Sequence, residues 1–161
     1  MNNRLLTLLR GHFVFVRRIE FLGNSFQEDM LVQGTADWNP SPTASTSLLY
    51  EEQGLMTPMN PSSVIAPSIP VRASHEWRFT GDIGDSSSAE VFFYPEIRHF
   101  YTISLSGDGP AFFKHHCSPD TYSGSFQVLK GGTAIRLDWD VHGPQKNYRI
   151  STMFERAATR T

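Results

Sequence analysis

Hydrophobic and polar positions alternate with a period of two along most of the chain, which is the spacing of a β-strand. In FVFVRRIEF (13–21), Phe13, Phe15, Arg17 and Ile19 fall on one face and the residues between them on the other. The same alternation recurs in further segments bounded by Gly, Pro, Asn, Asp and Ser: 28–38, 47–54, 71–79, 89–94, 98–105, 111–117, 121–129, 134–141 and 146–156. About ten such strands predict an all-β sandwich or closed barrel.

One segment has helical spacing instead. The leucines of RLLTLL form an apolar stripe, Asn2 or Asn3 can cap it, and Gly11 can end it. The N-terminal segment is rich in arginine and free of acids, as transit peptides are, but it continues directly into the first strand. We therefore expect a short helix at 3–10 that docks on the fold, within one domain over 1–161.

Two long loops interrupt the strands. NPSPTASTS (39–47) and MNPSSVIAPSIP (59–70) are rich in Pro and Ser, and such loops lie at the rim of a barrel. The second carries the apolar Val64, Ile65 and Ile69, which makes it a candidate lid over the barrel opening. Packing of the same loop against the outer wall is the alternative.

Charge and cysteine content exclude several classes. The 14 Lys and Arg against 16 Asp and Glu give a net charge of -2, so no basic field recruits nucleic acid. A single cysteine forms no internal disulfide, which is typical of a reducing compartment. No apolar run approaches the roughly 18 residues of a membrane span. We expect a soluble, cytoplasmic protein with no membrane span.

The two ends of the chain resemble those of lipocalin-like barrels. Gly11-x-Phe13 after a short helix resembles their Gly-x-Trp opening, with Phe in place of the usual Trp. Arg156, near the end of the last strand, matches the arginine that packs over that aromatic ring. The resemblance implies a single lipocalin-like (calycin-type) antiparallel barrel of about 8–10 strands.

Nearly the whole chain resembles an uncharacterised family of short lipocalin-like proteins, a domain of unknown function. The matching pieces are GHFVFVRRI, LLYEEQG, HHCSPDTY and DVHGPQKNYRISTMFER. The chain departs from the family pattern in FFYPEIRHFY (92–101), where the family tends to carry Asp-Gly-Arg before an aromatic-His pair. The resemblance implies no established activity.

Polar and ionisable residues stand among aromatics on faces that should point inward. Burying them without partners costs several kcal/mol per charge, so they must pair with each other, with water or with a bound molecule. We therefore predict a binding barrel for a small, partly apolar ligand. Its candidate ligand-binding residues are Arg17, Tyr50, Glu52, His75, Trp77, His115, Cys117, Asp120, Tyr122, Lys146 and Tyr148. Because Arg17 and Lys146 are cationic, the ligand is expected to be anionic.

Several of these residues have structural alternatives. Arg17 and Glu52 can form a buried ion pair that serves only the fold. His115 can be a core histidine with its hydrogen bonds satisfied, and Cys117 a small buried hydrophobic residue. Asp120 can cap the turn that begins at Pro119.

Metal and haem are further alternatives. His115 and His116 are adjacent on a strand and point to opposite faces, and no Cys-x-x-Cys or His-x-x-x-His motif completes a metal site. His75, His115 and Cys117 are the remaining conceivable set, and we predict no metal. His75, His99 or His115 could hold haem, but no motif favours one of them, so the cofactor is left unassigned.

The same inventory also allows an enzyme or an interaction module. A histidine with Asp or Glu, Tyr50 or Tyr122 as a proton donor, and Arg17 or Lys146 on a negative charge would suffice for general acid-base chemistry. No hydrolase, phosphate-loop or dinucleotide motif identifies a reaction, so catalytic residues stay unknown. Exposed aromatics such as Tyr94, Phe100 or Trp139 would instead favour a partner surface or a homodimer.

Overall fold

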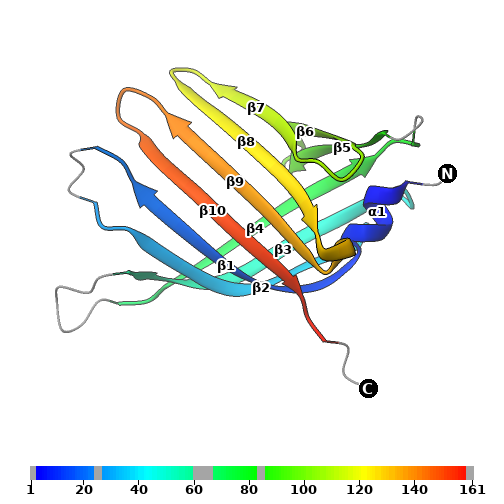
Figure 1. Ribbon diagram of the computed structural model, residues 1–161, viewed down its shortest axis with the longest axis horizontal. Helices are drawn as coiled ribbons and strands as arrows, with labels where there is room; N and C mark the ends of the chain where they lie inside the picture. Colours follow the sequence, from blue (N-terminus) through cyan, green and yellow to red (C-terminus); the bar gives the residue numbers. More distant parts are fainter. Residues whose placement is uncertain (1–2, 24–26, 60–66, 83–85, 159–161) are drawn as a thin grey trace.

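A computed structural model of the chain describes residues 3–23, 27–59, 67–82 and 86–158. These ranges hold a short helix, α1 (Arg4–Leu9), a 3-10 turn, η1 (Lys130–Gly132), and ten strands (Figure 1). The strands are β1 (Gly11–Phe21), β2 (Met30–Pro40), β3 (Ser47–Pro58), β4 (Ile69–Phe79), β5 (Ser86–Phe93), β6 (Arg98–Ser106), β7 (Ala111–Cys117), β8 (Asp120–Leu129), β9 (Ala134–His142) and β10 (Asn147–Arg156). All ten predicted strands are therefore confirmed, as is the N-terminal helix.

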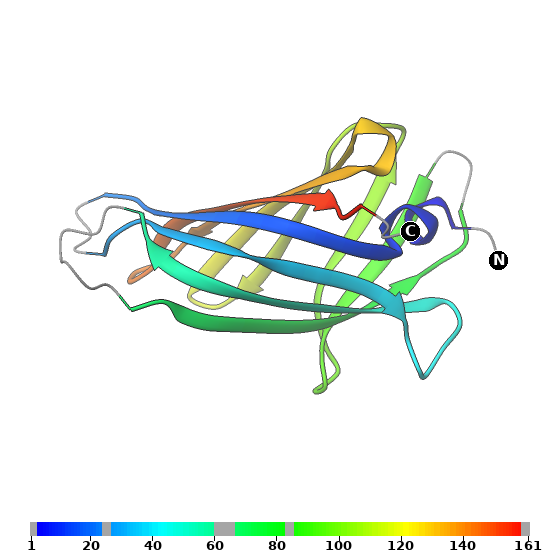
Figure 2. The ribbon, with the colours of Figure 1, turned by 90° about the horizontal axis from the view of Figure 1, so that it is seen from below.

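The strands form one antiparallel sheet that curves into a nearly closed barrel (Figures 1 and 2). Their order is β6-β5-β4-β3-β2-β1-β10-β9-β8-β7. Strands that are consecutive in the chain pair with each other, except β6 and β7, which form the two edges. β10 returns to pair with β1, so Phe15 lies opposite Phe154 and Arg17 opposite Thr152. β6 and β7, the two edges, meet through side chains: Tyr101 stacks on Phe113 with ring centroids 4.5 Å apart. The lipocalin-like all-β fold is thus confirmed.

The helix α1 covers one end of the barrel, here called the helix end (Figure 1). Asn3 is its N-cap, since the side chain accepts a hydrogen bond from the Leu6 N–H. Leu5 and Leu9 are fully buried on the face of the helix that meets the barrel. The amphipathic stripe therefore plugs the barrel and is part of the fold.

The direction of the strands identifies the opposite end of the barrel, here called the mouth end. The turns at 94–97, 118–119 and 143–146 lie there, and no helix of the described residues covers it (Figure 1). The predicted rim loop at 39–47 connects β2 to β3 at the helix end. The predicted lid residues Val64 and Ile65 lie outside the described residues.

Arg156 ties the two ends of the chain together. Its guanidinium lies 4.6 Å from the centre of the Phe13 ring and donates hydrogen bonds to the carbonyl oxygens of Arg10 (2.9 Å), Leu8 and Gly132 (3.3 Å). The predicted packing of this arginine over the aromatic ring is therefore present. A side chain at Gly11 would collide with the guanidinium, and the φ of +144° there also favours glycine.

Replacing Arg156 with methionine is expected to lower the free energy of unfolding by about 2 kcal/mol, because hydrogen bonds from a charged donor are lost while the apolar stem remains. Urea unfolding measures the loss. Arg136→Met is the matched control, because Arg136 is half exposed and pairs only with Asp138 within the described residues. Its expected cost is about 0.5 kcal/mol or less. Equal losses of unfolding free energy in the two variants would contradict this role of Arg156.

Candidate functional site

A cavity of about 290 Å³ occupies the barrel interior. That volume equals roughly ten water molecules, at the lower end of the range for small-molecule sites. Register places its lining in three layers from the mouth to the helix end. An aliphatic collar of Ile19, Met56, Val71 and Ile150 comes first, polar residues follow, and an aromatic floor lies deepest.

The polar layer is built on a buried ion pair between β1 and β3. Arg17 donates from both terminal nitrogens to the two carboxylate oxygens of Glu52, at 2.7 Å each, and from Nε to Thr152 Oγ1 at 2.9 Å. The side chains of Arg17 and Glu52 are 18% and 6% exposed. The two-pronged geometry is the strong form of this interaction. The predicted structural alternative, a buried Arg17–Glu52 pair, is therefore present in the cavity wall.

Arg17 and Glu52 both stay ionised although they are buried. Burial raises the pKa of Glu52, but the Arg17 hydrogen bonds and charge outweigh it, so the net pKa lies below the usual value. Burial lowers the pKa of Arg17, and the Glu52 bonds and charge reverse that direction, so the pKa ends above its usual value. Within the described ranges, these two opposite charges are the only ones among the cavity-lining side chains that are ionised at neutral pH.

Tyr50 and His75 complete the polar layer in neutral form. The Tyr50 hydroxyl donates a hydrogen bond to Glu52, and burial raises its pKa well above the usual value. His75 stacks on Tyr50 with ring centroids 5.7 Å apart, and burial lowers its pKa to about 4. Near pH 7 the interior therefore carries no net charge.

The floor of the cavity consists of packed rings. Trp38 lies 5.8 Å from Trp77 in an edge-to-face arrangement, 5.3 Å from Phe154 and 5.1 Å from Phe13, all as ring centroid distances. Trp77 lies 5.9 Å from Phe126. These contacts join strands from both halves of the barrel, so the floor is rigid and apolar.

A second group of predicted residues lies at the mouth end, outside the cavity lining. Lys146 Nζ is 3.2 Å from Asp120 Oδ2 and donates a hydrogen bond to Tyr122 Oη at 3.1 Å. The Tyr122 bond and the Asp120 charge both raise the pKa of Lys146. The Lys146 side chain is 46% exposed, so the prediction that it faces the interior is wrong. Lys146 precedes the first paired residue of β10, where strand alternation no longer holds.

The structure thus divides the predicted site residues. Arg17, Tyr50, Glu52, His75 and Trp77 line one cavity, whereas the remaining predicted residues do not: His115, Cys117, Asp120, Tyr122, Lys146 and Tyr148. The ring centroids of His115 and Tyr122 are 5.7 Å apart. Tyr148 is a separate residue of this group, and burial raises its pKa. Asp120 pairs with Lys146, and its carboxylate lies against Gly143.

Three further predictions are wrong. Cys117 is exposed, because it ends β7 at the mouth, so it is not a buried hydrophobic residue. Trp139 is 8% exposed and Phe100 is only partly exposed. Both line the cavity and stack on each other with ring centroids 5.4 Å apart, so neither belongs to an outer partner surface. Tyr94 is 37% exposed, as predicted.

Trp38 and Tyr101 line the cavity but were not predicted as site residues. Alternation along β2 contains the signal for Trp38, since Val32, Gly34, Ala36 and Trp38 share a face. Tyr101 follows the β5–β6 turn, where the register shifts between Val91 and Phe92, so alternation did not place it.

The described residues contain no group of three or more His, Cys, Asp and Glu side chains arranged to hold a metal ion. His75, His115 and Cys117 are therefore not gathered into one such group, and the exposed His99 contacts Thr102. Among the described helices, none is long and apolar enough to cross a membrane.

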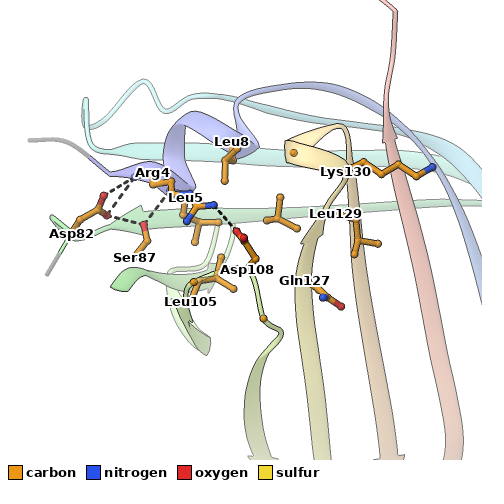
Figure 3. Close-up of a pocket in the computed structure, with 14 residues that line it drawn as sticks. Arg4, Leu5, Leu8, Asp82, Ser87, Leu105, Asp108, Gln127, Leu129 and Lys130 are labelled. Atoms are coloured by element: carbon orange, nitrogen blue, oxygen red, sulfur yellow. Dashed lines mark hydrogen bonds and ion pairs between the residues drawn. The ribbon is translucent and has the colours of Figure 1, made fainter. Parts of the chain in front are cut away.

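A larger cavity, about 650 Å³, lies at the helix end between α1, the β6–β7 turn and the end of β8 (Figure 3). Four of its polar side chains bond in pairs: Arg4 pairs with Asp108 at 2.9 Å, and Ser87 donates to Asp82 at 2.8 Å. Because those groups are satisfied, the barrel interior is the stronger candidate despite its smaller volume.

One family model and two solved structures are similar to the chain. A model described as "Family of unknown function (DUF6314)" matches residues 9–156. The solved structure of an S-type phycobiliprotein lyase from Guillardia theta is similar with a TM-score of 0.63 and 7% sequence identity, over 97% of this chain and 92% of that one. A redesigned beta barrel is similar with a TM-score of 0.48 and 12% identity, over 97% of both chains. No curated protein matches the chain.

Proposed function

The chain belongs to this family of unknown function, and from the geometry of its interior we propose that the protein is a binding barrel for a small, partly apolar ligand with an anionic end. The observation that carries the proposal is the layered cavity of about 290 Å³. An aliphatic collar surrounds polar residues above an aromatic floor, an arrangement suited to an amphipathic molecule. The phycobiliprotein lyase supports the fold alone at 7% identity.

Arg17 supports the anionic end. A guanidinium has five N–H groups, and three of those on Arg17 bond Glu52 and Thr152. Two N–H groups are therefore left for a ligand oxygen inside the cavity. Lys146 pairs with Asp120 at the mouth, so the anionic end rests on Arg17. An acid that enters head first would bond Arg17 and leave its apolar part against the collar.

A matched pair of probes tests this proposal. 3-Phenylpropionate and 3-phenylpropionamide have the same shape and differ in charge. Both are expected to raise the melting temperature, because binding to the folded state alone stabilises it. The acid is expected to bind about fivefold tighter or more in calorimetric titration, since hydrogen bonds from a charged donor to a charged acceptor are stronger.

The variant Arg17→Met/Glu52→Leu keeps the interior neutral and is expected to abolish the preference for the acid. Arg136→Met, which removes a cation from the outer surface, serves as the matched control and should retain it. Equal affinity of the two probes for the unmodified protein would overturn the anionic end. Absence of any stabilisation by either probe would overturn the binding barrel.

The proposal also includes a cellular location and an oligomeric state. A cytoplasmic location accords with the unpaired, exposed Cys117. A homodimer would use outward aromatics such as Phe112, which is 79% exposed on the edge strand β7. Sedimentation measures that state directly, as a doubled mass.

A further inference from the structure

Two polar side chains that line the cavity have no hydrogen-bond partner. Tyr101 is 3% exposed and His75 is partly buried, and neither makes a hydrogen bond within the described residues. The Tyr101 hydroxyl and the His75 ring nitrogens retain accessible surface, whereas the indole nitrogens of Trp38 and Trp77, also unpartnered, are enclosed. The open space that Tyr101 and His75 reach is the cavity, so both can bond a molecule held there.

The two side chains lie on neighbouring parts of the cavity wall. His75 is on β4 and Tyr101 on β6, and the Phe100 ring contacts both, with centroid distances of 5.5 Å to His75 and 4.7 Å to Tyr101. Tyr101 pairs with Val91, which pairs with Trp77, so Tyr101 lies one inward-facing position deeper than His75. A ligand in the cavity therefore meets both groups at the edge of the aromatic floor.

Both groups are uncharged near pH 7. Burial raises the pKa of Tyr101, and the charge of Glu52 raises it further. Burial lowers the pKa of His75 to about 4, although the charge of Glu52 opposes this shift. Neutral groups do not offset the charge of a buried ion, so an uncharged partner suits them. A phenolic hydroxyl donates a hydrogen bond and a neutral imidazole accepts one, so that partner both accepts and donates.

We propose that Tyr101 and His75 form a subsite for an uncharged hydroxyl group on the ligand, which accepts from Tyr101 and donates to His75. This subsite rests on the proposed function, since it specifies a second group on the ligand of the same cavity. The ligand is then an organic acid that carries a hydroxyl: its carboxylate bonds Arg17, and its hydroxyl bonds Tyr101 and His75. A hydrocarbon group in the same place would leave both side chains without a partner.

Benzyl alcohol and ethylbenzene form the probe pair, because they are neutral and nearly isosteric and differ in an OH against a CH₃ group. Tyr101→Phe removes only the hydroxyl, so benzyl alcohol is expected to bind this variant about five- to tenfold more weakly in calorimetric titration. Ethylbenzene makes no hydrogen bond and should bind the variant at least as tightly as the unmodified protein. Tyr94→Phe is the matched control, because it removes a tyrosine hydroxyl that is exposed and outside the cavity lining, and it should change neither affinity.

His75 provides a readout in the unmodified protein. In protein labelled with ¹⁵N-histidine, benzyl alcohol is expected to move the resonance of the unprotonated His75 ring nitrogen upfield, as accepting a hydrogen bond does. Ethylbenzene should not cause this movement. The His75→Phe variant assigns the resonance, because the His75 signal is absent from its spectrum.

The outcomes separate the subsite from the proposed function. An affinity for benzyl alcohol that is unchanged in Tyr101→Phe, or a His75 signal that does not move when the alcohol binds, would overturn the subsite and leave the binding barrel standing. Failure of both probes to bind the unmodified protein would overturn the subsite and the proposed function together. If Tyr101→Phe fails to fold, the His75 signal of the unmodified protein decides.

Discussion

Replacing Glu52 with leucine is expected to lower the free energy of unfolding by about 3–5 kcal/mol, because it leaves the Arg17 guanidinium buried without its counter-charge. The loss arises from the 2.7 Å bonds between Arg17 and Glu52, and from the Tyr50 hydroxyl, which also donates to Glu52. Urea unfolding measures it. For a chain of this size, such a loss is a large fraction of total stability.

The double variant Arg17→Met/Glu52→Leu should recover most of that loss, since apolar residues of similar volume replace a buried pair at little cost. Asp108→Asn is the exposed control. It removes a pair with Arg4 in which the side chains are 92% and 56% exposed, so its expected cost is below about 1 kcal/mol. A double variant as unstable as Glu52→Leu would mean that the pair does more than neutralise its own charges.

Stability is expected to fall by up to about 3 kcal/mol as the pH drops from 6.5 to 4, because of His75. Burial lowers the pKa of His75 to about 4 in the folded protein, whereas in the unfolded chain its pKa has the usual value of 6.5. Between these values the unfolded state binds a proton that the folded state does not, so stability is fully present above pH 6.5 and is lost toward pH 4. Glu52, whose pKa is lowered, adds a loss in the same direction at lower pH.

His75→Phe should flatten this pH dependence, since the ring contacts with Tyr50, Phe93 and Phe100 can persist without a titrating group. His99→Phe is the matched control, because it replaces an exposed histidine by the same residue. Urea unfolding at several pH values gives both slopes. An unchanged slope in His75→Phe would place the titrating group elsewhere.

Strand alternation predicted the fold well because it is a local property. Phe13, Phe15, Arg17 and Ile19 point inward from β1, as the period of two requires. Alternation fails where strands end: Cys117 and Lys146 have inward parity, yet they lie at the mouth and contact solvent. Trp139 shows the reverse error, since it is predicted among the exposed aromatics although it shares the inward face with Leu137 and Val141.

The site itself depends on register between strands, which the sequence of one strand does not contain. Arg17 and Glu52 are 35 residues apart and meet because β1 and β3 both pair with β2. Strand alternation predicts that both residues point inward. It does not decide between an ion pair that serves only the fold and a contact with a ligand. The unpartnered indoles of Trp38 and Trp77 depend on packing from several strands, so no local pattern identified them.

Native mass spectrometry of the protein purified without denaturation tests the binding barrel most directly, together with an Ala73→Phe variant. Ala73 lines the cavity, so a phenyl ring there occupies ligand space. We expect a small non-covalent adduct on the 18.2 kDa chain, released on denaturation and reduced in the variant. An adduct that persists undiminished in Ala73→Phe, or a bare chain that also takes up none of the added probes, would contradict it.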